Sequence, residues 1–243
     1  MTAKQRVSIL ALLGLVTAIV AVIMAAMAVT GYRSGDLHFA TAIQTFERAA
    51  YIAVAALAVS LIGLWQAHRL HRGLWPGLLG ALLALPLVVF IANFEYAARA
   101  YPPINDISTD TEDPPTFWDV PNPVTYPGEH VAEQQRRGYP DLKPLTLSLD
   151  ADQGFELALA VARDMGWAIV AENRADRQIE AVDTTWLFGF KDNVVIRLQD
   201  DVGRTRVDVR SHSRLGRIDR GANARRIQRY LRTLAQRAQK PGE

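Results

Sequence analysis

The sequence predicts an α+β protein in which three N-terminal transmembrane helices precede a soluble antiparallel sheet with two helices on one face. Two observations lead to this fold class. Residues 1–100 contain three long apolar stretches with seven basic and three acidic residues, whereas residues 101–243 contain 20 basic and 22 acidic residues. Beyond residue 144, short alternations of period two are combined with two segments of helical period. We therefore divide the chain into an anchor (1–100), an arm (101–143) and a soluble domain (144–243).

The three apolar stretches lie at residues 7–30, 49–67 and 74–94, and none contains a charged residue. Each is close to or above the length of about 20 residues that crosses a bilayer. The first is longer than the apolar region of a signal peptide, about 7–15 residues, so we expect it to be retained. Because ionisable residues are absent, we interpret the stretches as an anchor. A channel, a transporter or a partner-binding bundle is the alternative.

Basic residues beside the helix ends predict the orientation of the anchor. The N-terminus and the second loop contain Lys4, Arg6, Arg69 and Arg72, and the opposite side contains Arg33, Arg48 and Arg99. This excess predicts a cytoplasmic N-terminus and, after three crossings, a C-terminal domain outside the cytoplasm. We expect a protein of the bacterial inner membrane with its soluble domain in the periplasm. The chain has no cysteine, which excludes disulfides, thiolate metal sites and a cysteine nucleophile.

The arm is rich in proline, since residues 101–150 hold nine of the 12 prolines of the chain. Proline fixes φ, removes a hydrogen-bond donor and favours extended geometry in the residue before it. We therefore predict an extended arm without a helix. Large side chains such as Phe117, Trp118 and Tyr139 recur along it, and they indicate that the arm is ordered and packed along a folded core.

The soluble domain begins with a short strand at Leu145 to Leu149. Asp150 is a predicted N-cap, and Gly166 ends the amphipathic helix that follows. Four further strands are predicted at 167–172, 178–184, 191–199 and 204–214, before a last helix that begins near Asp219. The order β-α-β-β-β-β-α predicts an antiparallel sheet with both helices on one face.

The hairpin between the last two predicted strands has a consistently apolar face if Ile196 pairs with Val207. This register places Arg197 directly opposite Arg206, in a row that also contains Arg210. Like charges at opposite positions of a sheet are unfavourable, by about 0.2–1 kcal/mol. We therefore expect an anionic group near this face, beginning with Asp208 on the diagonal.

The stretch INDISTDTEDPP, residues 104–115, contains the carboxylates of Asp106, Asp110, Glu112 and Asp113. The net charge is −11 over residues 101–202 and +9 over residues 203–243. We predict that these carboxylates hold the arm against arginines, with Asp110 or Asp113 as the main contact. The candidate partners are Arg197, Arg206, Arg210, Arg214, Arg217, Arg220 and Arg226, and the last four are preferred. A solvated arm and a ligand or cation site are the alternatives.

Several separated motifs resemble those of one family. They are ISTDT (107–111) with DPP (113–115), YPD (139–141), GW (166–167) and VDVRSHSRLGRIDRGANARRI (207–227). Their order is similar to that of the domain of unknown function 1499 (DUF1499) family over roughly residues 102–238. The three-helix extension is similar to that of membrane-attached members. The resemblance implies no biochemical activity.

Motifs for catalysis are weak. Glu129, His130 and Glu133 are too few ligands to predict a metal, and Ser211 and His212 point to opposite faces of a strand. We expect no catalytic residue, no metal, no cofactor and no nucleic-acid partner. A binding module for membrane lipid or for a membrane or envelope protein is the preferred function. The alternative is an enzyme of cell-envelope metabolism that uses acids of the arm, such as Asp110 and Asp113.

Two further segments have alternative interpretations. The aromatic residues of TTWLFGF (184–190) alternate, which predicts one buried face of a strand, and a membrane-contacting or ligand-binding edge is the alternative. The arginines at 214, 217 and 220 surround Gly216 before the last helix. We interpret them as solvated charges, and an anionic lipid headgroup or glycan site is the alternative.

Overall fold

The computed structural model describes residues 7–239. The chain forms two compact units, and the boundary between them lies between Tyr96 and Ala97, in the last turns of the third helix. The first unit has an alanine-rich core, whereas larger apolar side chains form the core of the second.

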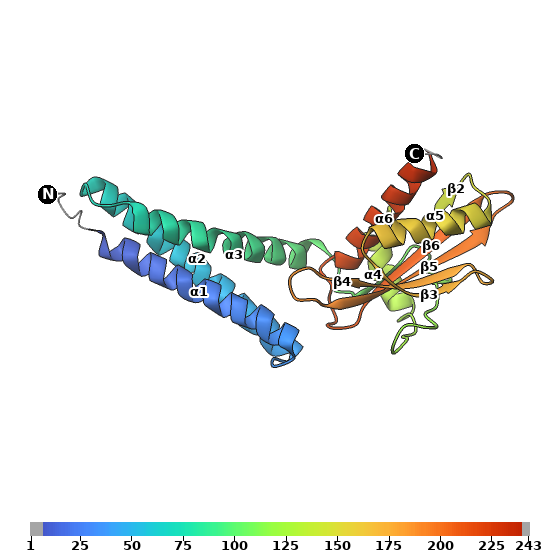
Figure 1. Ribbon diagram of the computed structural model, residues 1–243, viewed down its shortest axis with the longest axis horizontal. Coiled ribbons are helices and arrows are strands. Elements are labelled where there is room, and N and C mark those ends of the chain that lie inside the picture. Colours follow the sequence, from blue (N-terminus) through green and yellow to red (C-terminus); the bar gives the residue numbers. More distant parts are fainter. Residues whose placement is uncertain (1–6, 240–243) are drawn as a thin grey trace. The chain divides into compact units, whose positions relative to one another are not determined.

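The first unit contains three helices that are long and apolar enough to span a membrane. They are α1 (Ile9–Ser34), α2 (Phe39–Arg69) and α3 (Trp75–Ala100), whose last turn belongs to the second unit (Figure 1). Small residues allow them to pack closely: a Cβ atom on Gly63 of α2 would lie 2.3 Å from the backbone nitrogen of Ala11 in α1. The three predicted apolar helices are therefore confirmed.

The second unit contains an antiparallel sheet and further helices, which confirms the α+β fold class. Its elements are β1 (Asp106–Ser108), α4 (Glu129–Gly138), β2 (Leu145–Leu147), α5 (Ala151–Asp164), β3 (Ala168–Asn173), β4 (Gln178–Thr184), β5 (Lys191–Asp200), β6 (Thr205–Ser213) and α6 (Ala222–Ala238). The strand order is β1-β6-β5-β4-β3, and β2 also pairs with β6. β1 and β2 thus lie along the same side of β6, at different positions of its length.

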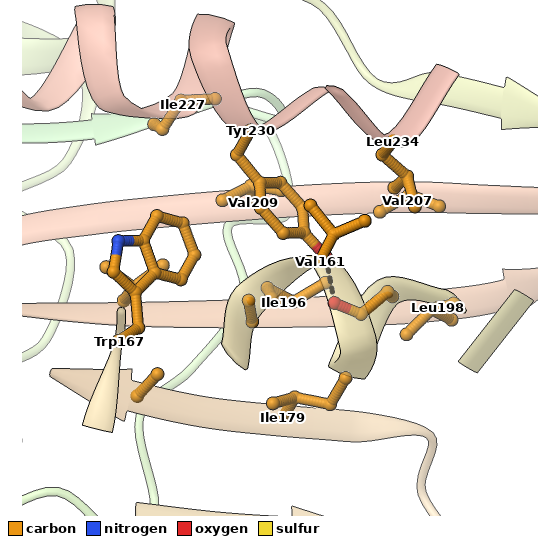
Figure 2. Packing of buried hydrophobic residues seen from close by; sticks show 14 of the residues in the cluster. Val161, Trp167, Ile179, Ile196, Leu198, Val207, Val209, Ile227, Tyr230 and Leu234 are labelled. Atoms are coloured by element: carbon orange, nitrogen blue, oxygen red, sulfur yellow. Dashed lines mark hydrogen bonds between the residues drawn. The ribbon is translucent and has the colours of Figure 1, made fainter. Parts of the chain in front are cut away.

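Helices α5 and α6 cover one face of the sheet (Figure 1). Asp150 caps α5 as predicted, because its side chain accepts a hydrogen bond of 2.8 Å from the backbone nitrogen of Gln153. Figure 2 shows Tyr230 of α6 among the apolar side chains of the core, and its hydroxyl donates to the carbonyl of Ala158 in α5 at 2.9 Å. This hydrogen bond satisfies a buried hydroxyl and joins the two helices.

The arm packs on the opposite face of the sheet. Phe117 and Val120 of the arm are buried against Val195 of β5, which points away from the two helices. The arm also contains α4 and β1, so the prediction that it has no helix is wrong for residues 129–138. No proline lies between residues 128 and 139, and this interval is long enough for a short helix.

The predicted strand at TTWLFGF is also wrong. Residues 185–190 form a turn in which the backbone nitrogen of Gly189, at φ +77°, donates to the carbonyl of Thr185 at 2.9 Å. Phe188 is buried and stacks on Phe190 at 4.9 Å, whereas Trp186 is 87 % exposed. The left-handed conformation of the glycine breaks the alternation that a strand requires.

Candidate functional site

The most deeply buried ion pair of the second unit joins Asp106 of β1 to Arg210 of β6. Nε and Nη2 of the arginine donate to the two carboxylate oxygens at 2.9 and 2.7 Å, in a bidentate pair. Both side chains are at most 1 % exposed. Burial opposes ionisation of Asp106, but hydrogen bonds and charges from Arg210 and His212 hold the pKa of its carboxyl below the ordinary value.

Arg210 also organises the arm around its guanidinium. Nη1 donates to the carbonyl of Pro115 at 3.1 Å and Nη2 to that of Val124 at 3.1 Å. The guanidinium lies over the rings of Phe117 and Tyr126, at 4.7 and 5.4 Å from their centroids. The arm is thus wrapped around one buried cation.

A second group of charges lies where the arm crosses β5 and β6. Arg206 donates to Asp110 at 2.7 Å, and Arg197 donates to Asp113 at 2.8 Å. Asp208, which is fully buried, accepts hydrogen bonds from both arginines. The anionic group expected near this face is therefore provided by Asp208 and by the arm.

The exposure of these acids differs. The side chain of Asp110 is 16 % exposed and that of Asp113 is 76 % exposed. Asp110 also accepts from the backbone nitrogens of Glu112 and Asp113, at 3.0 and 2.9 Å, and so fixes the turn before the two prolines. Glu112 is exposed, and its carboxylate forms no ion pair with any residue in 7–239.

The register of the β5–β6 hairpin differs by two residues from the prediction. Ile196 pairs with Val209, and Arg197 pairs with Asp208 instead of Arg206. A shift of two residues keeps every side chain on its face, so the apolar pattern alone could not distinguish the two registers. The observed register replaces a like-charge neighbour with an opposite charge.

Glu180 of β4 was not among the predicted site residues. Its carboxylate is 1 % exposed and accepts hydrogen bonds from the backbone nitrogens of Trp118, Asp119 and Val120, at 2.6, 3.0 and 2.9 Å. Gln178 donates to it as well, at 3.0 Å. An acid on the outward face of a strand normally faces water, and only the arm, more than 50 residues earlier, changes that environment.

The arm carboxylates pair with arginines other than most of the preferred ones. Asp106 pairs with Arg210, Asp110 pairs with Arg197 and Arg206, and Asp113 pairs with Arg197. Arg226 of α6 instead binds Asp183 at 2.6 Å and Asp192 on the helix-covered face of the sheet. The preference for the residues at 214, 217 and 226 as arm partners is therefore wrong. The sequence alone does not indicate that β6 lies between the arm and α6.

Polar residues around Arg226 shape the loop between β6 and α6. Ser211 and Ser213 point toward α6, where Asn223 accepts from the first at 2.7 Å and donates to the second at 2.9 Å. Asp219 accepts from the backbone nitrogens of Gly221 and Asn223, at 2.7 and 2.9 Å. His212 lies on the opposite face, beside Asp106. A serine–histidine nucleophile pair is therefore not formed here.

The loop itself exposes both basic and apolar side chains. Leu215 and Ile218 are 41 % and 45 % exposed, and Arg217 between them is exposed as well. Arg214 donates to Asn193 at 2.6 Å, and Arg220 adopts a left-handed φ of +51°. Within residues 7–239, neither Arg214 nor Arg217 has a carboxylate within salt-bridge distance.

A cavity of about 240 Å³ opens beside the first turns of α6. It is lined by Met165, Trp167, Asp183, Ala222, Arg225, Arg226 and Arg229. Asp183 is paired with Arg226, while Arg225 and Arg229 are exposed. The free charge at this cavity is therefore positive. No cluster of three or more potential metal ligands occurs within residues 7–239.

Comparison with known protein families gives a match in the region that contains the motifs of the second unit. The family model described as "Protein of unknown function (DUF1499)" matches residues 106–234, which begin at β1 and end in α6. No curated protein matches the chain. The matched region is more than half of the chain and includes most of the arm, the sheet and the loop that Asn223 and Arg226 hold. The protein therefore belongs to the DUF1499 family, whose function is unknown.

Proposed function

We propose that this protein is an integral protein of the bacterial inner membrane whose C-terminal domain lies in the periplasm and acts as a binding module. One observation carries the proposal. The aspartates that face the arm-covered side are paired with arginines, whereas Arg217 in the loop after β6 and Arg225 and Arg229 at the cavity beside α6 have no carboxylate within salt-bridge distance in residues 7–239. Surface charge left uncompensated in this way favours an anionic partner.

The proposed orientation rests on the basic residues near the helix ends. Lys4, Arg6, Arg69 and Arg72 flank one side of the three helices, against Arg33, Arg48 and Arg99 on the other. This places the N-terminus in the cytoplasm, and three crossings then place the soluble domain in the periplasm.

A binding role is favoured over an enzyme that uses the acids of the arm. A carboxylate that acts as an acid or base must reach a substrate proton. Asp110 instead accepts from Arg206 and from two backbone nitrogens, and Asp106 is enclosed with Arg210. Both acids are therefore engaged in contacts that stabilise the arm.

Reporter fusions after Gly73 and at the C-terminus test the location. A reporter that works only in the periplasm should be silent after Gly73 and active at the C-terminus, and the reverse pattern would refute the proposed orientation.

Crosslinking of the intact protein in its membrane tests the binding role. A photo-crosslinking residue at position 217, in the exposed loop, should give products that mass spectrometry can identify. The matched control is position 202, because Val202 is 97 % exposed and lies in the turn at the opposite end of the sheet. If position 217 gives no product beyond those of the control, the domain is not a binding module at this surface.

A further inference from the structure

We propose that the domain docks on the anionic phospholipid surface of its own membrane through a basic rim. The rim consists of Arg214, Leu215, Arg217, Ile218 and Arg225. The inference deepens the proposed function, because it names the partner of the exposed arginines and rests on their role in binding.

The connection of the chain brings the rim close to the membrane. Tyr101 follows α3 directly, and its backbone nitrogen donates to the carbonyl of Ala97 at 3.1 Å. From Phe94, the last residue of the apolar stretch, to Tyr101 the helical rise is about 10 Å. The polar layer of a bilayer is about 5–8 Å thick on each side. The connection from Phe94 to Tyr101 is thus short, which limits how far the second unit can lie from the membrane surface.

The first residues after α3 hold the rim directly. The guanidinium of Arg225 lies over the ring of Tyr101, at 5.3 Å from its centroid. Asn105 donates to the carbonyl of Gly216 at 2.7 Å, and the backbone nitrogen of Asp219 donates to the carbonyl of Ile104 at 3.0 Å. The rim is therefore tied to the residues that directly follow α3.

The chemistry of the rim fits a membrane surface better than water alone. Arginine attracts lipid phosphates, and partly exposed Leu215 and Ile218 are positioned to enter the interfacial layer. The β4–β5 loop lies at the same end of the sheet, because Asp192 of β5 pairs with Ser213 of β6. This loop adds Trp186, which is 87 % exposed, and tryptophan is enriched at membrane interfaces.

The two turns at the opposite end of the sheet carry acidic and basic residues in equal number. Asp176 lies between Arg174 and Arg177 in the β3–β4 turn, and Asp200 and Asp201 lie beside Arg204 at the β5–β6 turn. At the rim end, Asp183 and Asp192 are paired with Arg226, which leaves the positive charge of the rim in excess. An anionic surface therefore favours the orientation in which the rim end faces it.

Single-cysteine labelling of the full-length protein tests the docking, since the native chain contains no cysteine. Ile218→Cys carries an environment-sensitive fluorophore at the rim, and Val202→Cys carries it at the far end. Each protein is placed at one copy per nanodisc, either in phosphatidylglycerol mixed with phosphatidylcholine or in phosphatidylcholine alone. Nanodiscs that contain lipids with a quencher near the headgroup report contact with the membrane.

With phosphatidylglycerol, the probe at 218 should shift to the blue and be quenched, while the probe at 202 stays in water. The effect should decrease in about 1 M NaCl, where the Debye length is about 3 Å. Arg217→Gln with Arg225→Gln should lower the ratio of docked to undocked protein by about 25-fold, since each basic residue contributes about fivefold. The matched control, Arg204→Gln with Arg232→Gln, removes the same charge outside the rim and should leave the ratio unchanged.

Three results would overturn the inference. They are a probe at 218 that stays in water, a response that ignores lipid charge and salt, and a response that occurs only with two copies per nanodisc, which would indicate self-association. If the probe stays in water but position 217 crosslinks to a protein, lipid docking fails and the proposed binding role survives. If crosslinking fails as well, both proposals fail.

Discussion

Replacing Asp106 with asparagine should destabilise the second unit strongly, because it leaves Arg210 buried without its counter-ion. Both side chains are at most 1 % exposed, and the aspartate accepts two hydrogen bonds from the guanidinium. Breaking such a buried pair costs about 3–5 kcal/mol. A domain is stable by only about 5–15 kcal/mol in total, so this loss is a large fraction.

The matched control is Asp113→Asn. Asp113 also pairs with an arginine, but its side chain is 76 % exposed, and an exposed pair contributes about 0–1 kcal/mol. Asp110→Asn should fall between the two, because its carboxylate is 16 % exposed. Both of these substitutions should increase proteolysis within residues 104–120 while the sheet remains folded.

Urea unfolding of the purified full-length protein in detergent micelles measures these differences through tryptophan fluorescence. For a slope of about 2 kcal/mol per molar urea, Asp106→Asn should lower the midpoint by about 2 M and Asp113→Asn by less than about 0.5 M. In the double variant Asp106→Asn with Arg210→Met, the loss should be smaller than the sum of the single losses, because no buried charge remains. Equal midpoints for Asp106→Asn and Asp113→Asn would refute the reasoning.

The pH dependence gives the same variant a second readout. The pKa of Asp106 in the folded protein is below its ordinary value of 3.8. The contribution of this carboxylate to stability is therefore fully present above pH 3.8 and is lost as the pH falls through the folded pKa. Asp106→Asn should remove this part of the acid sensitivity, and an unchanged acid profile would contradict the assignment.

Three further predictions concern the arm and the sheet. Glu180→Gln replaces a charged acceptor with a neutral one and should cost about 1.5–3 kcal/mol, seen as faster hydrogen exchange at residues 118–120; unchanged exchange there would argue against the contact. Burial raises the pKa of Tyr126 from 10.0 to about 12, so its contribution to stability is present below pH 10 and lost as the pH rises through about 12. Tyr126→Phe should reduce this alkaline loss, and an identical alkaline profile would contradict the prediction. Cysteines at Gln199 and Arg206, which pair across the hairpin, should form a disulfide readily, whereas cysteines at 197 and 206 should do so if the alternative register held.

The apolar pattern predicted the elements of the fold well, because local periodicity determines them. The three long apolar helices, the capped α5 and the long strands β4, β5 and β6 all overlap their predicted positions, although α2 begins ten residues before the predicted stretch. The errors occur where an element is short or where the surrounding sequence favours another conformation. β1 has only three residues, and α4 lies in a segment that its proline-rich surroundings made look extended.

The contacts of the candidate site were harder to predict, because they depend on which face each element covers. Opposite charge in the arm and in the C-terminal segment correctly indicated attraction, but it could not separate arginines on the two faces of the sheet. The charge of Asp208 could have indicated the observed register of the hairpin. Shifting the hairpin by two residues pairs it with Arg197 and leaves the apolar face intact. No comparable feature of the sequence indicated the role of Glu180, since only the folded arm buries it.

The arrangement of charges indicates how the motif VDVRSHSRLGRIDRGANARRI serves the domain. Ser211, Asn223 and Arg226 direct their hydrogen bonds inward and join the end of β6 to α6. Because these contacts are internal, they determine the shape of the loop between the two elements. Leu215, Arg217 and Ile218 lie within this held loop and remain exposed. The motif therefore combines a rigid polar support with a presented surface, and the surface is the part that is available to a partner.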